Sequence, residues 1–389
     1  MLTEPHFLRA RRRHVAEVLE LLGQKIDLPQ TQYERAEQGY NAVAEWLTTS
    51  EDPRLVRALI SPHGSMRLQT AIRHRLGKEF DVDLIGLLSD VTPDTPPSVV
   101  KTLIGARLFA SERYADITVE KNRCWQIQYE GDLHLDVTPA IYNPTCPNGG
   151  LLVPDKEGRC WKATHPFGYA ERFEARSKLQ GQFRFAKMAE ARDAQAGIEA
   201  LPGQQVLKGV LKRGVQLVKW NRDIYFSTRD ASVAPISIIQ TTLLAWSYQR
   251  AVGARVYDDE LELLLESIRG MPEFIEVRRD GYWIPNETTH GENFAEKWNT
   301  HPGRAEAFYA WHAQALATIE KAVEVDGEDE LAKHLSEGFG RTVVDAAFND
   351  MNAKVGAARQ AGRLGIGATG LVTGVSASPR TKGHTFFGR

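Results

Sequence analysis

Two short segments in which acidic and apolar residues alternate constrain this chain most. The first is Phe80-Asp-Val-Asp-Leu84, and the second is Leu133-His-Leu-Asp-Val137. Successive side chains of a strand point to opposite faces, so Asp81 and Asp83 share one face while their apolar neighbours point into a core. Because aspartate is depleted in strands, this alternation favours a functional face over an ordinary solvated one.

A third carboxylate completes the pattern. Asp136 shares a strand face with His134, and in a paired sheet it can lie beside Asp81 and Asp83. Carboxylates this close repel each other and raise a pKa unless a cation neutralises them. Mg²⁺ suits the position, because it prefers hard oxygen ligands and completes its shell with substrate phosphates. The sequence therefore predicts that these three aspartates are catalytic and bind two Mg²⁺ ions, for which Mn²⁺ can substitute.

Such a site has a defined chemistry. Two metal ions can position an attacking hydroxyl and stabilise the pyrophosphate that leaves in an in-line displacement. Asp136 is the natural acceptor for the proton of that hydroxyl. The expected reaction is therefore nucleotidyl transfer from a nucleoside triphosphate.

Gly64 and Ser65 precede the first acidic strand and form its expected opposite wall. A glycine lets the backbone approach phosphate closely, and the amides of a following helix favour anionic oxygens. Ser65 has two compatible roles, contact with the donor triphosphate and N-cap of that helix. We therefore expect both residues to bind nucleotide.

The N-terminal part predicts an α/β (α+β) lobe with a small mixed sheet. Hydrophobic periodicity and turn signals give its expected elements. They are helices over 5–23, after Pro29 and over 98–109, strands over 56–60, 80–88, 117–120, 124–129 and 133–138, and a loop from 140 to 166.

Helical periodicity dominates the rest of the chain. Helices are expected over 169–196, 204–221, 235–251, 257–269, 302–325 and 328–349. We therefore predict a catalytic lobe with the N-terminal helices over 1–165, a helical lobe over 166–355, and a tail over 356–389. The tail is rich in glycine and cannot bury much surface, so we expect it to be flexible.

Composition narrows the class of protein. The formal net charge is −2 over 389 residues, which gives no strong case for long nucleic acid as a partner. Three cysteines without paired spacing favour a reducing, cytoplasmic location. No stretch approaches the ~18 apolar residues of a membrane span. An arginine cluster over 9–13 is interpreted as a solvated helix face rather than a polyanion contact.

The motif set resembles a known family. Gly64-Ser65, Asp81-x-Asp83 and Asp136 are similar to the motifs of the DNA polymerase β-like nucleotidyltransferases. The fuller segments resemble the bacterial cGAS/DncV-like nucleotidyltransferases of CBASS anti-phage systems. These segments are 63–68, 80–84, 134–140, 215–223, 235–243, 293–298 and 384–388.

The resemblance implies a polymerase β-like lobe and a helical lobe with the active site in the cleft between them. It implies synthesis of a cyclic di- or trinucleotide second messenger from nucleoside triphosphates, with ATP among them and the second nucleotide open. Lys219 and Ser237 would reach back to the nucleotide phosphates from the helical lobe. From the residues alone, Lys219 can equally be an exposed residue of an amphipathic helix, and Ser237 a helix start.

The same resemblance suggests a companion enzyme of the E1/E2 kind that acts on the C-terminal tail. Here Gly388 is followed by Arg389, which departs from a terminal glycine. Two other functions stay open: a linear oligoadenylate-type or RNA-tailing transferase, and a nucleotide-binding regulator without turnover. In the helical lobe, Arg222 with Asp223 is interpreted as an ion pair, and Trp298 as a packing anchor.

Overall fold

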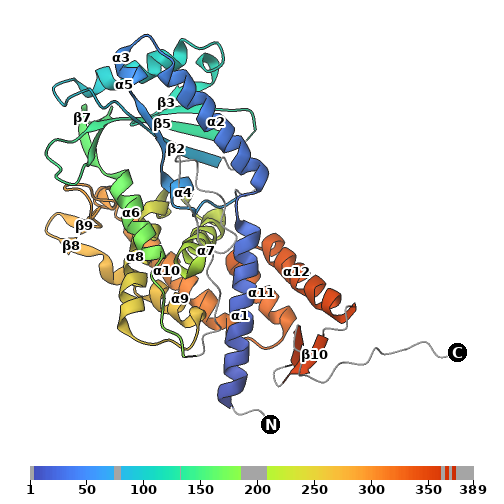
Figure 1. Cartoon of the computed structure of the whole chain (residues 1–389). Helices are drawn as coiled ribbons and strands as arrows, with labels where there is room; N and C mark the ends of the chain where they lie inside the picture. Colours follow the sequence, from blue (N-terminus) through green and yellow to red (C-terminus); the bar gives the residue numbers. More distant parts are fainter. Residues whose placement is uncertain are drawn as a thin grey trace.

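The computed structural model describes residues 4–73, 80–131, 133–184, 208–360, 364–367 and 370–373. Figure 1 shows two lobes, an α/β lobe built on a mixed sheet and a larger lobe of helices. The fold class predicted from the sequence is confirmed. Across the described ranges, no helix is both long and apolar enough to cross a membrane.

A seven-stranded sheet forms the centre of the α/β lobe. Its strands run in the order β1-β2-β5-β4-β3, and β6 joins β5 to β7. The central pair β2–β5 is parallel, and every other pairing is antiparallel. The strands are β1 (Leu59–Pro62), β2 (Phe80–Leu87), β3 (Thr118–Glu120), β4 (Trp125–Gln128), β5 (Leu133–Tyr142), β6 (Leu151–Asp155) and β7 (Cys160–Thr164).

One face of this sheet is covered by helices. Helices α2 (Gln30–Thr48) and α5 (Pro97–Phe109) lie on it, and the side chains of Leu135 and Val137 there are fully buried. Figure 1 shows the short helix α4 (Gly64–Arg67) on the other side, toward the helical lobe. The strand period therefore leaves the polar residues of β2 and β5 facing the helical lobe.

Helix α7 (Gly209–Tyr225) is the centre of the helical lobe. It packs against several other helices, and most of its residues are buried. The other helices of the lobe are α1 (Glu4–Ile26), α6 (Pro166–Ser177), α8 (Ser237–Ala254), α9 (Glu260–Arg269), α10 (Gly303–Ala322), α11 (Glu328–Phe339) and α12 (Arg341–Gln360).

Helix α1 corrects the predicted lobe boundary. We expected it in the catalytic lobe, but its apolar stripe, which includes Val15, Leu22 and Ile26, is buried in the same core as α7 and α8. From α1 onward, the described chain therefore runs from the helical lobe into the α/β lobe, which it enters between α1 and α2. An amphipathic stripe predicts that a helix packs but not which core it joins.

Three expected elements differ in detail. The predicted loop over 140–166 contains the end of β5 and the hairpin of β6 and β7, whose five-residue strands are hidden among turn residues. The predicted strand over 56–60 is replaced by the turn of helix α3 (Pro53–Val56) and by β1. The single helix over 328–349 is two helices, because Gly340 takes a positive φ of 81° between them.

The C-terminal boundary also differs from the expectation. Helix α12 continues to Gln360, and the strands β10 (Leu364–Gly367) and β11 (Gly370–Thr373) pair beyond it. A small hairpin, β8 (Glu276–Arg278) with β9 (Gly281–Trp283), lies between α9 and α10. Gly388 and Arg389, and the predicted helix beyond residue 184, lie outside the described residues.

Candidate active site

The parallel pairing of β2 and β5 arranges the predicted carboxylates. The register places Asp83 directly beside Asp136 and Asp81 directly beside His134. Asp81 has a side chain that is 55% exposed, and its Oδ1 lies 3.7 Å from Nδ1 of His134. The structure therefore places all three aspartates on the face toward the helical lobe, with two of them adjacent and the third one step along β2.

Asp83 and Asp136 form a pair of like charges. Burial and the neighbouring Asp136 carboxylate raise the pKa of Asp83 to about 7. Within the described ranges, neither carboxylate forms an ion pair with a Lys, Arg or His side chain. The expected repulsion between carboxylates acts between Asp83 and Asp136, whereas Asp81 lies beside His134. A cation bound between them would stabilise both charges.

Gly64 lies against this pair. Its φ is +61°, and a Cβ at this position would collide with Oδ2 of Asp83. The preceding residue, His63, donates its backbone N–H to the carbonyl of Asp83 at 2.9 Å and so fixes the turn to β2. A glycine is needed here for both its left-handed conformation and its missing side chain.

Ser65 is not the N-cap that we predicted. Helix α4 begins one residue earlier, at Gly64, and its N-cap is His63, which makes no side-chain capping bond. The helix is a single turn of four residues, so any phosphate held there would meet a few local amides rather than a long helix dipole. The Ser65 hydroxyl makes no hydrogen bond within the described residues.

Sequence reasoning missed three neighbours of the pair. Gln126 of β4 lies opposite Asp136 in the antiparallel register, and its Nε2 donates to Asp136 Oδ1 at 3.0 Å. Burial and Asp136 raise the pKa of the Cys124 thiol, which stays protonated beside that carboxylate. Burial lowers the pKa of His63 to about 4, so its imidazole is neutral near pH 7. The alternation Trp125-Gln-Ile-Gln128 before a hairpin turn was the available signal.

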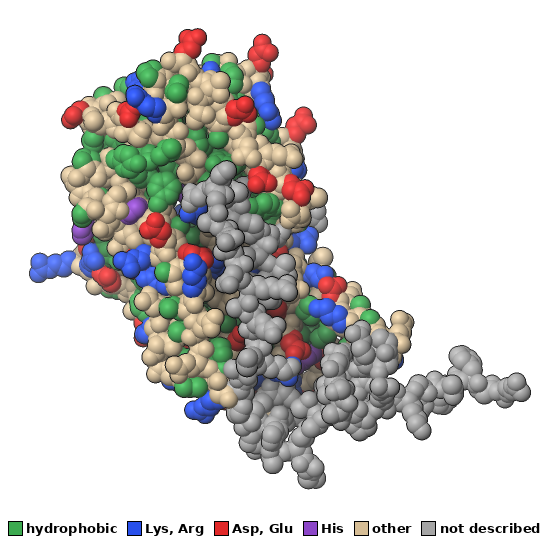
Figure 2. Space-filling view, in the orientation of Figure 1, with side chains coloured by type: hydrophobic (Ala, Val, Ile, Leu, Met, Phe, Trp, Pro, Cys, Tyr) green, Lys and Arg blue, Asp and Glu red, His purple; other side chains and the backbone are tan. Residues whose placement is uncertain are grey.

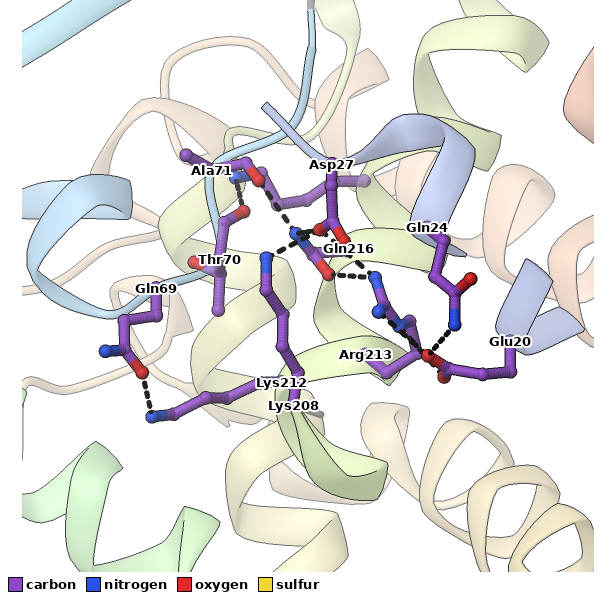
Figure 3. Close-up of polar contacts among 11 residues, drawn as sticks. Glu20, Gln24, Asp27, Gln69, Thr70, Ala71, Lys208, Lys212, Arg213 and Gln216 are labelled. Carbon is purple, nitrogen blue, oxygen red and sulfur yellow. Dashed lines mark hydrogen bonds and ion pairs between the residues drawn. The ribbon is translucent and has the colours of Figure 1, made fainter. Parts of the chain in front are cut away.

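A row of long polar side chains on α7 holds the segment that follows α4 (Figure 3). Lys212 donates through Nζ to Oε1 of Gln69 at 2.7 Å, and Gln216 donates through Nε2 to the carbonyl of Ala71 at 2.8 Å. Lys219 completes the row and donates to the carbonyl of Thr70 at 2.9 Å. We call Lys212, Gln216 and Lys219 the α7 row. Through these hydrogen bonds, the helical lobe holds three successive residues of the α/β lobe in place.

The cations near this row have acidic partners. Asp27, at the end of α1, accepts from Lys208 Nζ at 2.6 Å and from Arg213 Nη1 at 3.1 Å. Arg213 also pairs with Glu20 at 2.9 Å, and Lys212 pairs with Glu174 at 2.8 Å. Because these cations are almost fully buried, such pairing is required for the folded state.

The structure shows where Lys219 and Ser237 lie. Their contact with phosphate stays a prediction. Lys219 is 5% exposed, so the alternative of an exposed helix residue is wrong. Burial and Arg222 lower its pKa to about 8. Ser237 is the first residue of α8, and its Oγ lies 3.4 Å from Nη1 of Arg222. The predicted ion pair of Arg222 with Asp223 is confirmed at 2.7 Å.

Trp298, Asn293 and Tyr248 of the helical lobe make structural contacts. Trp298 is buried in the helical core, as predicted. Asn293 accepts from the backbone N–H groups of Ile284 and Ala295 and so shapes a loop. Tyr248 is buried, and its hydroxyl donates to the carbonyl of Leu179 at 2.6 Å. These contacts account for the three side chains without a ligand.

Charge on the surface is mixed. On the visible face of the described residues, Figure 2 shows acidic and basic side chains interspersed over both lobes rather than a continuous basic band. The N-terminal arginines form ion pairs within the fold: Arg11 with Asp326, Arg12 with Asp259 and Arg13 with Glu17. The side chain of Arg13 is 62% exposed, as expected for a solvated helix face, whereas those of Arg11 and Arg12 are only 14% and 23% exposed.

The donor set fits a divalent cation by its chemistry. Carboxylate oxygens are the ligands that Mg²⁺ prefers, and the like-charged pair forms no ion pair in the described part of the chain, although the charge of Lys219 acts on Asp83 from a longer distance. In the present side-chain positions, the described residues contain no group of three or more His, Cys, Asp or Glu that could hold a metal ion. Asp81, beside His134, is the member that stands apart.

Comparison with known proteins finds a matching domain and two similar proteins. Residues 14–176 match the model of the Second Messenger Oligonucleotide or Dinucleotide Synthetase (SMODS) domain. A c-di-GMP synthase of Roseivirga ehrenbergii is 27% identical over 382 residues, 96% of each chain. The cyclic dinucleotide synthase CdnG of Bradyrhizobium diazoefficiens is 24% identical over 374 residues, 91% of this chain and 87% of that protein.

Solved structures agree with the fold. The structure of the B. diazoefficiens CD-NTase CdnG in complex with GTP has a TM-score of 0.66 at 20% identity, covering 86% of this chain and 97% of that chain. Escherichia coli DncV bound to 3′-deoxy GTP has a TM-score of 0.53 at 16% identity, covering 88% and 90%. The domain match and the two relatives thus show that this chain is similar to the cGAS/DncV-like nucleotidyltransferases, and the solved structures share its fold.

Proposed function

We propose that this enzyme condenses nucleoside triphosphates into a cyclic dinucleotide and releases pyrophosphate. The observation that carries the proposal is the Asp83–Asp136 pair, which forms no ion pair within the described residues and lies against a glycine turn. Two full-length relatives that are named as cyclic dinucleotide synthases support the type of product.

GTP is the substrate that we propose first. A relative is named as a c-di-GMP synthase, and a similar structure contains GTP. ATP, which the sequence led us to expect, remains the second nucleotide to be tested. The product analysis described below also distinguishes larger rings and rings that contain two different bases.

Asp81, Asp83 and Asp136 would hold two Mg²⁺ ions, with Mn²⁺ as a substitute. When bound, the ions supply charge stabilisation for the attacking oxygen and for the leaving pyrophosphate. Asp83 and Asp136 are already adjacent on neighbouring strands, and Asp81, more than half exposed, completes the set by a change of side-chain conformation. Asp136 would accept the proton of the attacking hydroxyl. It lies on β5, whereas the glycine turn that would bind the donor triphosphate contacts Asp83 on β2.

Gly64 and Ser65 would bind the donor triphosphate. The glycine leaves room for a phosphate oxygen beside Asp83, and the Ser65 hydroxyl has no competing bond in the described structure. Lys219 adds a positive charge close enough to influence Asp83, although one of its protons is used by Thr70. Ser237 stays a prediction from the resemblance, since its described contact is with Arg222.

The biological role stays a prediction. An anti-phage function would appear as reduced plaque formation in cells that carry the enzyme with its neighbouring genes. The E. coli CdnC structure contains a HORMA partner, and a companion protein is proposed here by analogy. The proposed E1/E2-type action on the tail involves Gly388 and Arg389, outside the described residues.

Product analysis tests the proposal. The purified enzyme is incubated with each nucleoside triphosphate and with each pair, in the presence of Mg²⁺, and products are treated with phosphatase before mass spectrometry. We expect a phosphatase-resistant dinucleotide that disappears in the variant Asp83→Asn with Asp136→Asn and after chelation of the metal. A phosphatase-sensitive oligonucleotide would indicate the linear transferase instead. Nucleotide binding without pyrophosphate release would indicate a regulator.

A further inference from the structure

Strand β5, which carries Asp136, lies between β2 and β4, and Gln126 contacts Asp136 from β4. Residues Gln126 and Asp136 are direct partners in the antiparallel β4–β5 register, and the amide Nε2 lies 3.0 Å from Asp136 Oδ1. Gln126 is 8% exposed, so water competes little for this hydrogen bond. The donor therefore holds one oxygen of the carboxylate in a fixed direction.

The orientation of the Gln126 amide is itself fixed. Gln128, two residues along the same face, donates through Nε2 to Oε1 of Gln126 at 3.0 Å. With its oxygen engaged in this way, the Gln126 amide presents its nitrogen to Asp136. The chain Gln128–Gln126–Asp136 is thus a directed relay of hydrogen bonds on one face of the sheet.

The chemical nature of this donor matters. A lysine or arginine at position 126 would neutralise Asp136 and repel a divalent cation, whereas a glutamate would add a further charge to the crowded pair. A neutral amide holds the carboxylate and leaves its negative charge in place.

We propose that Gln126 is a positioning residue for the metal site, which orients Asp136 and leaves its second oxygen for a cation. The proposal rests on the function proposed above. Outer partners of this kind typically change metal affinity or activity about 10–100-fold when they are removed. Gln128 acts one step further away, and its removal has a smaller effect.

The test measures metal affinity directly. Mn²⁺ is titrated into the full chain in the presence of a non-hydrolysable GTP analogue, and free Mn²⁺ is followed by electron paramagnetic resonance. Gln126→Met removes the donor at similar volume. We expect Mn²⁺ affinity to fall about 10–100-fold, the Mg²⁺ concentration for half-maximal activity to rise in parallel, and KM for nucleotide at saturating metal to change less than about threefold.

A matched control separates positioning from general structure. Gln24 donates to Glu20 Oε1 at 3.2 Å on α1, so Gln24→Met removes the same type of contact far from the sheet. This variant should bind Mn²⁺ as the wild type does. If Gln126→Met does not fold, Gln126→Asn keeps the amide but is one methylene too short, and it should show the same loss.

The outcomes distinguish the two proposals. Asp136→Asn must lose Mn²⁺ affinity if the proposed function is right. If Asp136→Asn loses affinity while a folded Gln126→Met or Gln126→Asn binds Mn²⁺ as tightly as the wild type, the positioning role is wrong and the function stands. If Asp136→Asn itself binds Mn²⁺ normally, the metal site on which both proposals depend is wrong.

Discussion

Two clusters of charge contact the segment from Gly64 to Ala71, and they are built in opposite ways. Around the α7 row, Lys208 and Arg213 share Asp27, and Lys212 meets Glu174. On the sheet, Asp83 lies beside Asp136, and no cation pairs with either in the described ranges. Buried charges that serve the fold are paired, and charges that are left unpaired mark a site that needs a ligand.

The two clusters are connected through one short segment. Residues 69–71 follow the glycine turn and are held by the α7 row, while the turn itself contacts Asp83. The paired cluster therefore sets the position of the wall that faces the unpaired one. Stability and chemistry are separable by mutation of Asp27 and of the Asp83–Asp136 pair, because these residues belong to different clusters.

The largest effect is expected at the unpaired cluster. Replacing Asp83→Asn together with Asp136→Asn removes metal ligands, and product formation should fall by about 1000-fold or more. Because the change also removes the repulsion that raises the pKa of Asp83, the melting temperature should stay the same or rise. Calorimetry and product assays on the same preparation measure both. A large fall in melting temperature would mean that this pair serves the fold.

The paired cluster should respond in the opposite sense. Asp27→Ala leaves Lys208 and Arg213 without their shared partner, and the free energy of unfolding should fall by about 3–5 kcal/mol. Urea denaturation measures this loss, and activity per folded molecule should stay within about threefold. Glu17→Ala, which breaks the exposed pair with Arg13, is the control and should change stability by less than about 1 kcal/mol. Equal effects of the two substitutions would contradict the comparison.

The glycine turn connects the two clusters. Gly64→Ala adds a methyl group against Asp83 at a φ of +61°, so we expect activity to fall about 10–100-fold and stability to fall by about 1–2 kcal/mol. Gly149→Ala is a matched control, because Gly149 has a φ of +80° with nothing within 4 Å of an added Cβ. It should lose similar stability and keep full activity. A fully active Gly64→Ala would show that the turn does not shape the site.

The smallest effect is expected at the first turn of α8. Ser237→Ala should raise KM for nucleotide by about 2–10-fold, the range for one hydrogen bond, without changing kcat. Its described contact with Arg222 is long, at 3.4 Å, so stability should change little. Steady-state kinetics measure both constants. An unchanged KM would leave Ser237 as a helix start only.

The local pattern was enough to predict the strands of the site but not their pairing. The alternation at Asp81 and Asp83 specifies a strand and its polar face from adjacent residues. That Asp83 lies beside Asp136 depends on a parallel pairing across some 50 residues of chain, for which the sequence holds no local signal. Gln126 was missed for the same reason, since its importance comes from the residue opposite.

In the helical lobe, hydrophobic periodicity predicts the helices but not which core they join or which of their charged residues are buried. The apolar stripe of α1 was identified, but its assignment to the catalytic lobe was wrong, because the stripe does not name its partner. Lys212 and Arg213 look like exposed helix residues in the sequence, yet they are buried by acidic partners from α1 and α6. Ser65 was assigned as N-cap from its type, whereas the backbone pairing of His63 starts the helix earlier.

One measurement tests the central claim most directly: the change in melting temperature caused by Mn²⁺ with a non-hydrolysable GTP analogue. A ligand at about 100 times its dissociation constant stabilises the folded state by about 2.7 kcal/mol. We predict a clear increase for the wild type and for the weakened Asp27→Ala variant, and none for Asp83→Asn with Asp136→Asn. An equal increase in all three proteins would contradict the claim that the Asp83–Asp136 pair is the cation site.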